Sequence, residues 1–172
     1  MSGNGGVNGE NGTTGRHGMS SASIEVRPVE PRDREAWAEL YRGYREFYRV
    51  EPSERAVDTV WSWLHDPAHE TRGLIAAVDG QPLGLAHFRT FARPLSASHG
   101  LFLDDLFTAP AARGRGLGAA LLARLAELAR DEGATVVRWI TAEDNATARA
   151  LYDRVSQQTP WVTYDLAPAE PR

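Results

Sequence analysis

DDLFTAPAARGRGLG, residues 104–118, is the most informative stretch of the chain, because a predicted strand gives way to a predicted helix within it. Three glycines and two arginines stand at the turn itself, between Arg113 and Gly118. Glycines let backbone N–H groups approach a ligand closely, and a helix N-terminus carries partial positive charge. Arginine adds a fixed charge that suits phosphate oxygens. The turn therefore predicts a pyrophosphate site; the alternative is a turn that only joins two elements.

Two familiar phosphate-binding turns do not match this stretch. The P-loop places a lysine after its second glycine, and the chain contains no lysine. The dinucleotide fingerprint is GxGxxG, whereas Gly114, Gly116 and Gly118 give GxGxG. Neither a P-loop NTPase nor a dinucleotide-binding fold is indicated.

The rest of the chain alternates strand and helix patterns around this turn. The predicted elements are a strand at 24–29, helices at 33–51 and 53–66, a hairpin at 73–92, a strand at 101–109, a helix at 116–133, a strand at 134–141, a helix at 145–155 and a strand at 161–166. This order predicts one α/β (α+β) domain. Its central sheet would be mixed and mostly antiparallel, with six or seven strands and about four flanking helices.

Composition divides the chain into a lead and one domain. Residues 1–22 are rich in glycine and asparagine and are predicted to be disordered, and residues 23–168 form the domain. The net charge of −4 does not indicate nucleic-acid binding, and the absence of cysteine excludes disulfides, thiolate metal sites and cysteine nucleophiles. No apolar run is long enough for a membrane span and no signal pattern is present, so a cytoplasmic protein is expected.

Two segments resemble the GNAT superfamily of N-acetyltransferases. The turn RGRGLG matches that family's R/Q-x-x-G-x-G/A signature, and LFLDDLFTAPAARGRGLGAALL resembles its fourth strand and third helix. NATARALYDRV resembles its second cofactor segment, in which a tyrosine follows an asparagine by seven residues. The resemblance covers about 24–166 and implies a GNAT fold, splayed between its fourth and fifth strands, that binds acetyl-coenzyme A (acetyl-CoA).

The resemblance also implies how the cofactor would be held. The pantetheine arm would pair with the backbone of Leu106, Phe107 and Thr108, in the wedge between the strands at 101–109 and 134–141. Asn145 would contact the pantetheine or the phosphates. The residues whose amides would hold the pyrophosphate are Arg113, Gly114, Arg115, Gly116, Leu117 and Gly118. The chain departs from the family after Tyr152, where SQQTPW replaces the usual glycine and aromatic.

Acetyl transfer to an amine needs a base, an oxyanion donor and a proton for the departing thiolate. A tyrosine titrates at about 10 and a thiol at about 8.5, so a protonated tyrosine can supply that proton. Tyr152 is the candidate acid and is also placed at the cofactor; its alternative is a tyrosine of the core. Asp104 is the candidate base and ammonium anchor, acting directly or through a water, and Asp105 is the second candidate.

Strand alternation sends the two acids to opposite faces, with Leu103, Asp105 and Phe107 expected on one of them. The histidines carry weaker indications. His87 and His99 are more readily structural or exposed, and His65 and His69 flank a proline without a third metal ligand. No metal site is predicted. The aromatic stripe of the first helix is mainly core packing, although its outer members could line an acceptor pocket.

The sequence therefore predicts an enzyme that moves an acetyl group from acetyl-CoA to a primary amine by direct attack in a ternary complex. The expected acceptor is a small molecule, such as an amino acid, a polyamine or an amino-bearing antibiotic. Two alternatives stay open: an acetyltransferase of protein or peptide amines, and a non-catalytic module that binds coenzyme A. Neither nucleic acid nor membrane is an expected partner, and a homodimer stays open.

Overall fold

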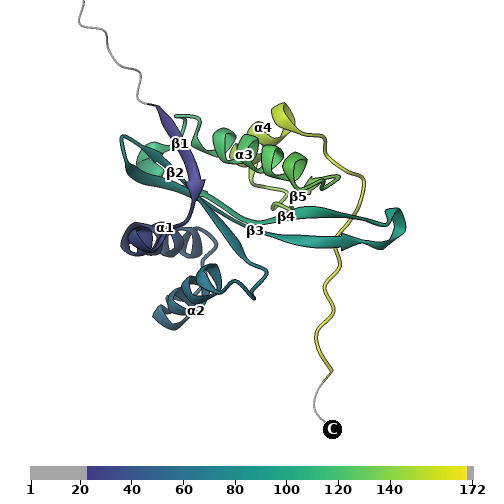
Figure 1. Cartoon of the computed structure of the whole chain (residues 1–172), viewed down its shortest axis with the longest axis horizontal. Coiled ribbons are helices and arrows are strands. Elements are labelled where there is room, and N and C mark those ends of the chain that lie inside the picture. Colours follow the sequence, from purple (N-terminus) through teal and green to yellow (C-terminus); the bar gives the residue numbers. More distant parts are fainter. Residues whose placement is uncertain (1–22, 170–172) are drawn as a thin grey trace, which may run out of the picture.

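A computed structural model describes residues 23–169, in which a five-stranded sheet lies between two helical layers (Figure 1). The strands are β1 (Ile24–Pro28), β2 (Arg72–Val78), β3 (Gln81–Arg93), β4 (Ser98–Thr108) and β5 (Val137–Arg138), in that spatial order. The first three pairings are antiparallel and the β4–β5 pairing is parallel. The mixed and mostly antiparallel sheet is confirmed; the predicted lead at 1–22 lies outside the described residues.

The predicted count of six or seven strands is wrong, because the sheet has five. The segment 161–166, predicted as the last strand, lies extended without a strand partner among the described residues, and Trp161 and Tyr164 are 78% and 88% exposed. An alternating pattern makes a strand only where a neighbouring edge supplies hydrogen bonds. Here β5 pairs over only two residues, so the last position of the sheet offers little edge.

Four helices cover the sheet, as predicted. They are α1 (Arg34–Phe47) and α2 (Glu54–His65) on one face, and α3 (Leu117–Asp131) and α4 (Ala146–Val155) on the other (Figure 1). Two of the predicted helix starts carry side-chain caps. The Ser53 hydroxyl accepts a hydrogen bond from the Ala56 N–H at 3.2 Å, and the Asn145 side chain accepts one from the Ala148 N–H at 3.4 Å.

The apolar run of β2 explains why there are two cores rather than one. Alternate residues of this strand point to opposite faces, so Leu74 and Ala76 pack toward α3 while Ile75 and Ala77 pack toward α1. A strand buried on both faces needs apolar residues at every buried position, as found from Leu74 to Val78. The sheet is therefore the middle layer, and any site within it is reached from its edges.

A bulge in β4 changes the predicted alternation around the two acids. His87 pairs with Asp105 and Phe88 pairs with Leu103, so Asp104 is an extra residue without a partner on β3. Leu103 consequently packs in the α3 core, whereas Phe107 packs in the α1 core. The prediction that Leu103, Asp105 and Phe107 share one face is wrong for Leu103, because a bulge shifts the alternation by one residue.

The sheet splays between β4 and β5, as the resemblance implies. The two strands pair only at Leu101 with Val137 and at Phe102 with Arg138. Beyond these pairs, within the described chain, no β5 residue faces the outer edge of β4 from Leu103 to Thr108. That stretch of β4 keeps its β3 partners on the other side, so it is ordered and has one open edge.

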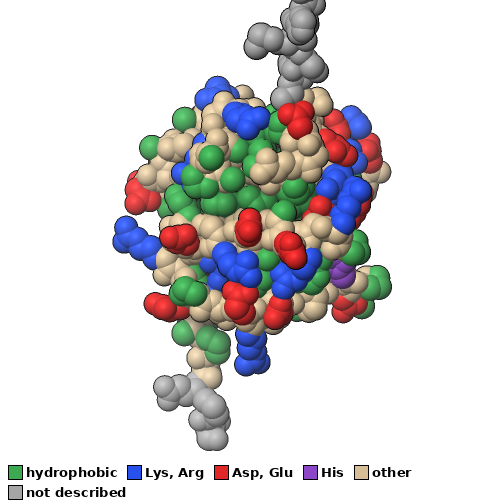
Figure 2. Space-filling view, turned by 90° about the vertical axis from the view of Figure 1, so that its left-hand side faces the viewer, with side chains coloured by type: hydrophobic (Ala, Val, Ile, Leu, Met, Phe, Trp, Pro, Cys, Tyr) green, Lys and Arg blue, Asp and Glu red, His purple; other side chains and the backbone are tan. Residues whose placement is uncertain are grey.

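The surface beside α1 and α2 is mixed in charge. Figure 2 shows acidic and basic side chains interspersed across the lower half of the molecule and apolar side chains gathered above them. Within residues 23–169, the helices are all too short or too polar to cross a bilayer.

Candidate active site

The turn between β4 and α3 has the backbone geometry that its glycines predict. Gly114 and Gly116 have φ values of 75° and 89°, in the left-handed region that favours glycine. Gly116 is the cap residue immediately before α3, and the first N–H groups of α3 have no carbonyl of their own helix to bond. These donors and the partial positive charge of the helix end suit an anion with several oxygens.

Gly118, the third glycine of the turn, allows two helices to pack closely. A Cβ at Gly118 would lie 3.2 Å from Cδ2 of Leu151, so the missing side chain lets α4 pack closely against α3. The Arg113 guanidinium lies over two phenyl rings, 5.8 Å from the Phe47 centroid and 6.0 Å from the Phe107 centroid. These contacts hold Arg113, one of the two arginines predicted to bind phosphate, toward α1.

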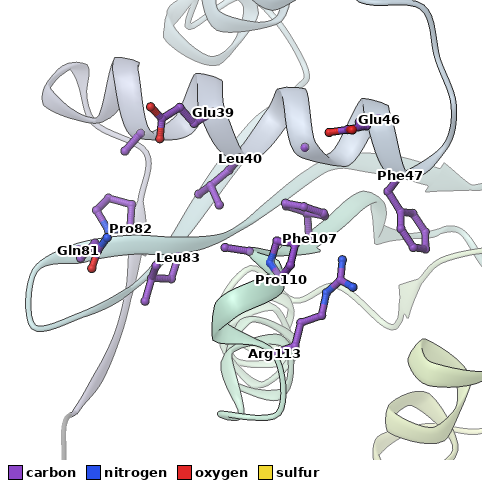
Figure 3. A pocket seen from close by; sticks show the side chains of 13 residues that line it. Glu39, Leu40, Glu46, Phe47, Gln81, Pro82, Leu83, Phe107, Pro110 and Arg113 are labelled. Atoms are coloured by element: carbon purple, nitrogen blue, oxygen red, sulfur yellow. The ribbon is translucent and has the colours of Figure 1, made fainter.

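A cleft of about 590 Å³ borders the turn on its α1 side (Figure 3). Its walls come from α1, from the start of β3 and from the turn at 110–113. Figure 3 shows Glu39 and Glu46 on the α1 wall, Phe107 and Pro110 opposite them, and Arg113 reaching up toward Phe47. The cleft thus combines two carboxylates, one guanidinium and an apolar floor.

The open edge of β4 leads directly into the turn. Leu106, Phe107 and Thr108 pair through their backbones with Ala86, Leu85 and Gly84 of β3. Because strand backbone groups alternate between the two edges, the β5-facing edge still presents N–H and C=O groups. An extended amide-containing ligand can therefore add to the sheet at this edge and end at the N-terminus of α3.

Asp105 belongs to a short chain of hydrogen bonds on the α1 face. Its Oδ2 lies 2.7 Å from Nδ1 of His87, and Nε2 of His87 accepts a hydrogen bond from the indole N–H of Trp37 at 2.9 Å. Trp37 and His87 are buried, with 0% and 1% of their surfaces exposed, whereas the Asp105 side chain is 23% exposed. The carboxylate is thus the accessible end of a buried polar chain.

Tyr44 lies beside the same carboxylate. Burial and then the negative charge of Asp105 raise the pKa of the Tyr44 hydroxyl, which therefore keeps its proton across the physiological range. The Tyr44 ring stands edge-on to Tyr48 at 5.0 Å and to Phe107 at 6.2 Å. The predicted aromatic stripe of α1 therefore places a protonated hydroxyl next to one candidate base.

Asp104, the extra residue of the bulge, has a different environment. Its carboxylate is 33% exposed and pairs with the Arg89 Nε at 3.3 Å. Partial burial raises the pKa of Asp104, although the charge of Arg89 acts in the opposite direction. The two neighbouring acids thus differ in their partners: Asp104 pairs with an arginine, and Asp105 pairs with a histidine.

Tyr152 is half-buried on α4, where its ring stands edge-on to Trp139 at 5.2 Å. Burial raises the pKa of Tyr152 to about 12, with a smaller contribution from Tyr48. Trp139 directly follows β5, and Tyr152 also packs against the apolar core beside α3. A place for Tyr152 at the cofactor stays a prediction.

The Asn145 side chain already has two partners in this structure. It caps α4, and its Nδ2 donates a hydrogen bond to Oγ1 of Thr141 at 3.3 Å. A cofactor contact by Asn145 stays a prediction.

The other three histidines within residues 23–169 contact groups other than the site. His99 bonds the Glu132 carbonyl at 3.2 Å, His65 bonds the Trp61 carbonyl at 3.0 Å, and His69 accepts from the Thr71 N–H at 3.1 Å. Sequence reasoning missed the partners Arg89 of Asp104, Trp139 of Tyr152 and Trp37 of His87. Trp37 and His87 are 50 residues apart, and no local pattern signals their contact.

Comparison with known proteins finds similarity to acetyltransferases. Residues 37–156 match the family model described as the acetyltransferase (GNAT) family. The D-amino-acid N-acetyltransferase of Saccharomyces cerevisiae is 28% identical over 148 residues, which cover 85% of this chain and 92% of that protein. The thialysine N-epsilon-acetyltransferase of Caenorhabditis elegans is 29% identical over 150 residues, covering 84% and 92% of the two chains.

A solved structure supplies the comparison of folds. The aminoglycoside N-acetyltransferase AAC(6')-Iy, bound to the bisubstrate analogue CoA-S-monomethyl-acetylneamine, superposes with a TM-score of 0.71. The match covers 86% of this chain and 100% of that one, at 18% sequence identity. At this identity the likeness concerns the fold.

Proposed function

Since the chain belongs to the GNAT family of acetyltransferases, which use acetyl-CoA, we propose that it acetylates the primary amine of a small molecule. The family makes the chain an acyltransferase that acts on amines. The class of acceptor and the residues that carry out the transfer belong to the proposal.

The observation that carries the proposal is the open edge of β4 ending at a helix N-terminus. The backbone of Leu106, Phe107 and Thr108 would pair with the two amides of the pantetheine arm, as an added strand does. The turn from Arg113 to Gly118 would then receive the pyrophosphate on the first N–H groups of α3. Arg115, which is exposed, would add charge to that end.

The transfer itself would use the acids of the bulge and the tyrosine of α4. Asp104 or Asp105 would take the proton from the ammonium group, since only the neutral amine has a lone pair for the thioester carbon. When the tetrahedral intermediate collapses, the C–S bond breaks and the thiolate leaves. Tyr152 would give that thiolate a proton, because its raised pKa keeps it protonated at neutral pH.

Three relatives favour a small acceptor. Their names specify D-amino acids, thialysine and aminoglycosides, which are small amines. This chain spans most of the length of each. The carboxylates at the site suit a cationic amine. An acetyltransferase of protein or peptide amines remains the competing function; the non-catalytic coenzyme A module is not favoured, because the family is one of acyltransferases.

An acceptor screen tests the proposal. The full chain is incubated with acetyl-CoA and a panel of D- and L-amino acids, polyamines, aminoglycosides and amino-terminal peptides, while thiol release is recorded and products are weighed by mass spectrometry. We expect release that depends on a small amine, with a product heavier by one acetyl group. Turnover with peptides alone would favour the protein acetyltransferase. Cofactor binding without turnover on any small amine or peptide of the panel would overturn the proposal.

A further inference from the structure

The chain of Trp37, His87 and Asp105 connects three different elements through side chains alone. Trp37 lies on α1, His87 on β3 and Asp105 on β4, and the links between them measure 2.9 Å and 2.7 Å. Aromatic neighbours fix the two inner members. The Trp61 ring lies 5.1 Å from the Trp37 ring, and the Tyr41 ring stands edge-on to His87 at 5.5 Å. Neither inner ring can turn without disturbing this packing.

The hydrogen bonds determine which nitrogen of His87 carries the proton. An indole N–H can only donate, so Nε2 of His87 must accept from Trp37 and carries no hydrogen. The proton of the neutral imidazole is therefore on Nδ1, from which it is donated to Oδ2 of Asp105. A second proton, on Nε2, would set two N–H donors against each other.

Packing alone does not explain such a chain. Polar groups in an apolar core cost free energy even when they are paired, and an aliphatic side chain at position 87 would suit the surrounding core. The bulge at Asp104 keeps Asp105 opposite His87, at the beginning of the open edge of β4. Asp105, the one partly exposed side chain of the three, thus lies where the proposed pantetheine arm begins.

We propose that His87 is a positioning residue for the acceptor amine: as the Nδ1–H tautomer fixed by Trp37, it holds the Asp105 carboxylate toward that amine. This inference rests on the function proposed above. A carboxylate has lone pairs in excess of the one that His87 occupies, and these remain for an ammonium group. Asp105, rather than Asp104 beside its arginine, then orients the amine for attack.

The tautomer is tested first, because it needs no substrate. In a ¹⁵N-labelled full chain, long-range ¹H–¹⁵N spectra separate protonated from unprotonated ring nitrogens, and His87→Asn identifies the signal by its loss. We expect a proton on Nδ1 and none on Nε2. Trp37→Phe removes the donor to Nε2 and should weaken this preference. A proton on Nε2 in the unaltered chain would overturn the inference.

Two substitutions at the same position then separate positioning from stability. His87→Leu and His87→Asn both leave the Trp37 N–H without its acceptor, but only the asparagine can still donate a proton near the Nδ1 position. For His87→Leu we expect kcat/KM for the amine to fall by about 100-fold, the scale of a misplaced reacting group. His87→Asn should recover about tenfold of that loss. The KM for acetyl-CoA should be the same in both variants.

Each of three further outcomes would overturn the positioning role of His87. Equal losses in both variants that follow their melting temperatures would mean that His87 only supports the core. An unaltered amine KM and kcat in a folded His87→Leu variant would overturn the inference while leaving the proposed function intact. An unaltered chain that acetylates no amine would overturn the proposed function, and the role of His87 with it.

Discussion

The same physical effect would suit the opposite tasks that we propose for Tyr152 and Asp104. Burial disfavours the charged form of each, so it raises both pKa values. For a tyrosine this keeps the proton available at neutral pH, as an acid requires. For an aspartate it brings the pKa nearer to neutral, as a base requires.

Tyr152→Phe is expected to lower turnover about 10²-fold or more, because the ring and its contact with Trp139 remain while the proton is lost. The KM for acetyl-CoA should be unchanged. Steady-state kinetics with the best acceptor measure both quantities, and Tyr164→Phe, at a residue 88% exposed, is the matched control. Near-normal turnover of the variant would indicate that Tyr152 only packs in the core.

Asp104→Asn keeps the shape of the side chain and removes a base and a negative charge. We expect both turnover and the amine KM to worsen. The loss should shrink as pH rises, because more of the amine is then already neutral. A rate profile from pH 6 to 10 measures this, beside the same profile for Asp105→Asn. A defect of Asp104→Asn that does not change with pH would indicate a structural partnership with Arg89 and leave Asp105 as the base.

Two local features determine how α3 and α1 begin. One is the left-handed turn that begins α3. The other is the link between β1 and the start of α1, where the Asp33 carboxylate accepts hydrogen bonds from Arg27 at 2.6 and 2.8 Å and one from the Glu30 N–H at 2.8 Å. Asp33 is 3% exposed, so this carboxylate is paired on all sides.

Gly116→Val is expected to abolish binding of acetyl-CoA while the domain still folds. The residue has φ of 89°, and a Cβ there would meet Ile24 Cδ1 at 3.7 Å, an ordinary contact. The strain comes from the left-handed backbone, about 1–2 kcal/mol for a residue with a Cβ. Gly133→Val, at φ of 70° at the other end of α3, imposes similar strain away from the turn. Calorimetric titration with acetyl-CoA measures the affinity of both variants, and equal affinities would make the turn a simple connector.

Asp33→Ala should destabilise the fold by about 3–5 kcal/mol, the usual cost of breaking a buried ion pair. The Arg27 hydrogen bonds lower the pKa of Asp33. Its contribution is therefore present above the unfolded pKa of about 3.9 and is lost as pH falls through the lower folded value. Urea unfolding at pH 7 and pH 3 should show the difference between variant and parent shrinking in acid. Arg32→Gln, which breaks an exposed pair with Glu30, should cost less than about 1 kcal/mol.

For the molecule as a whole, sequence patterns predicted what is local. Helix starts at Ser53 and Asn145 and the glycine turn before α3 depend on neighbouring residues, and the structure has all three. The bulge at Asp104 depends on how β3 and β4 align, and the pair of Trp37 and His87 depends on packing between α1 and β3. The segment 161–166 has a strand pattern, but a pattern cannot say whether an edge is there to receive it.

Acetyl-CoA should stabilise the whole fold, and its direct contacts should run from the open edge of β4 to the turn before α3. At about 100 times its dissociation constant the ligand should add about 2.7 kcal/mol to the free energy of unfolding. In hydrogen exchange, added protection should concentrate at 106–108 and in the first turn of α3, beyond the uniform gain expected in β1 and β2. ADP alone should protect only the turn, and pantetheine alone only the strand edge, because each carries one half of the proposed contacts. Protection confined to the cleft wall around Glu39 and Glu46 would move the binding site to the α1 side of the sheet.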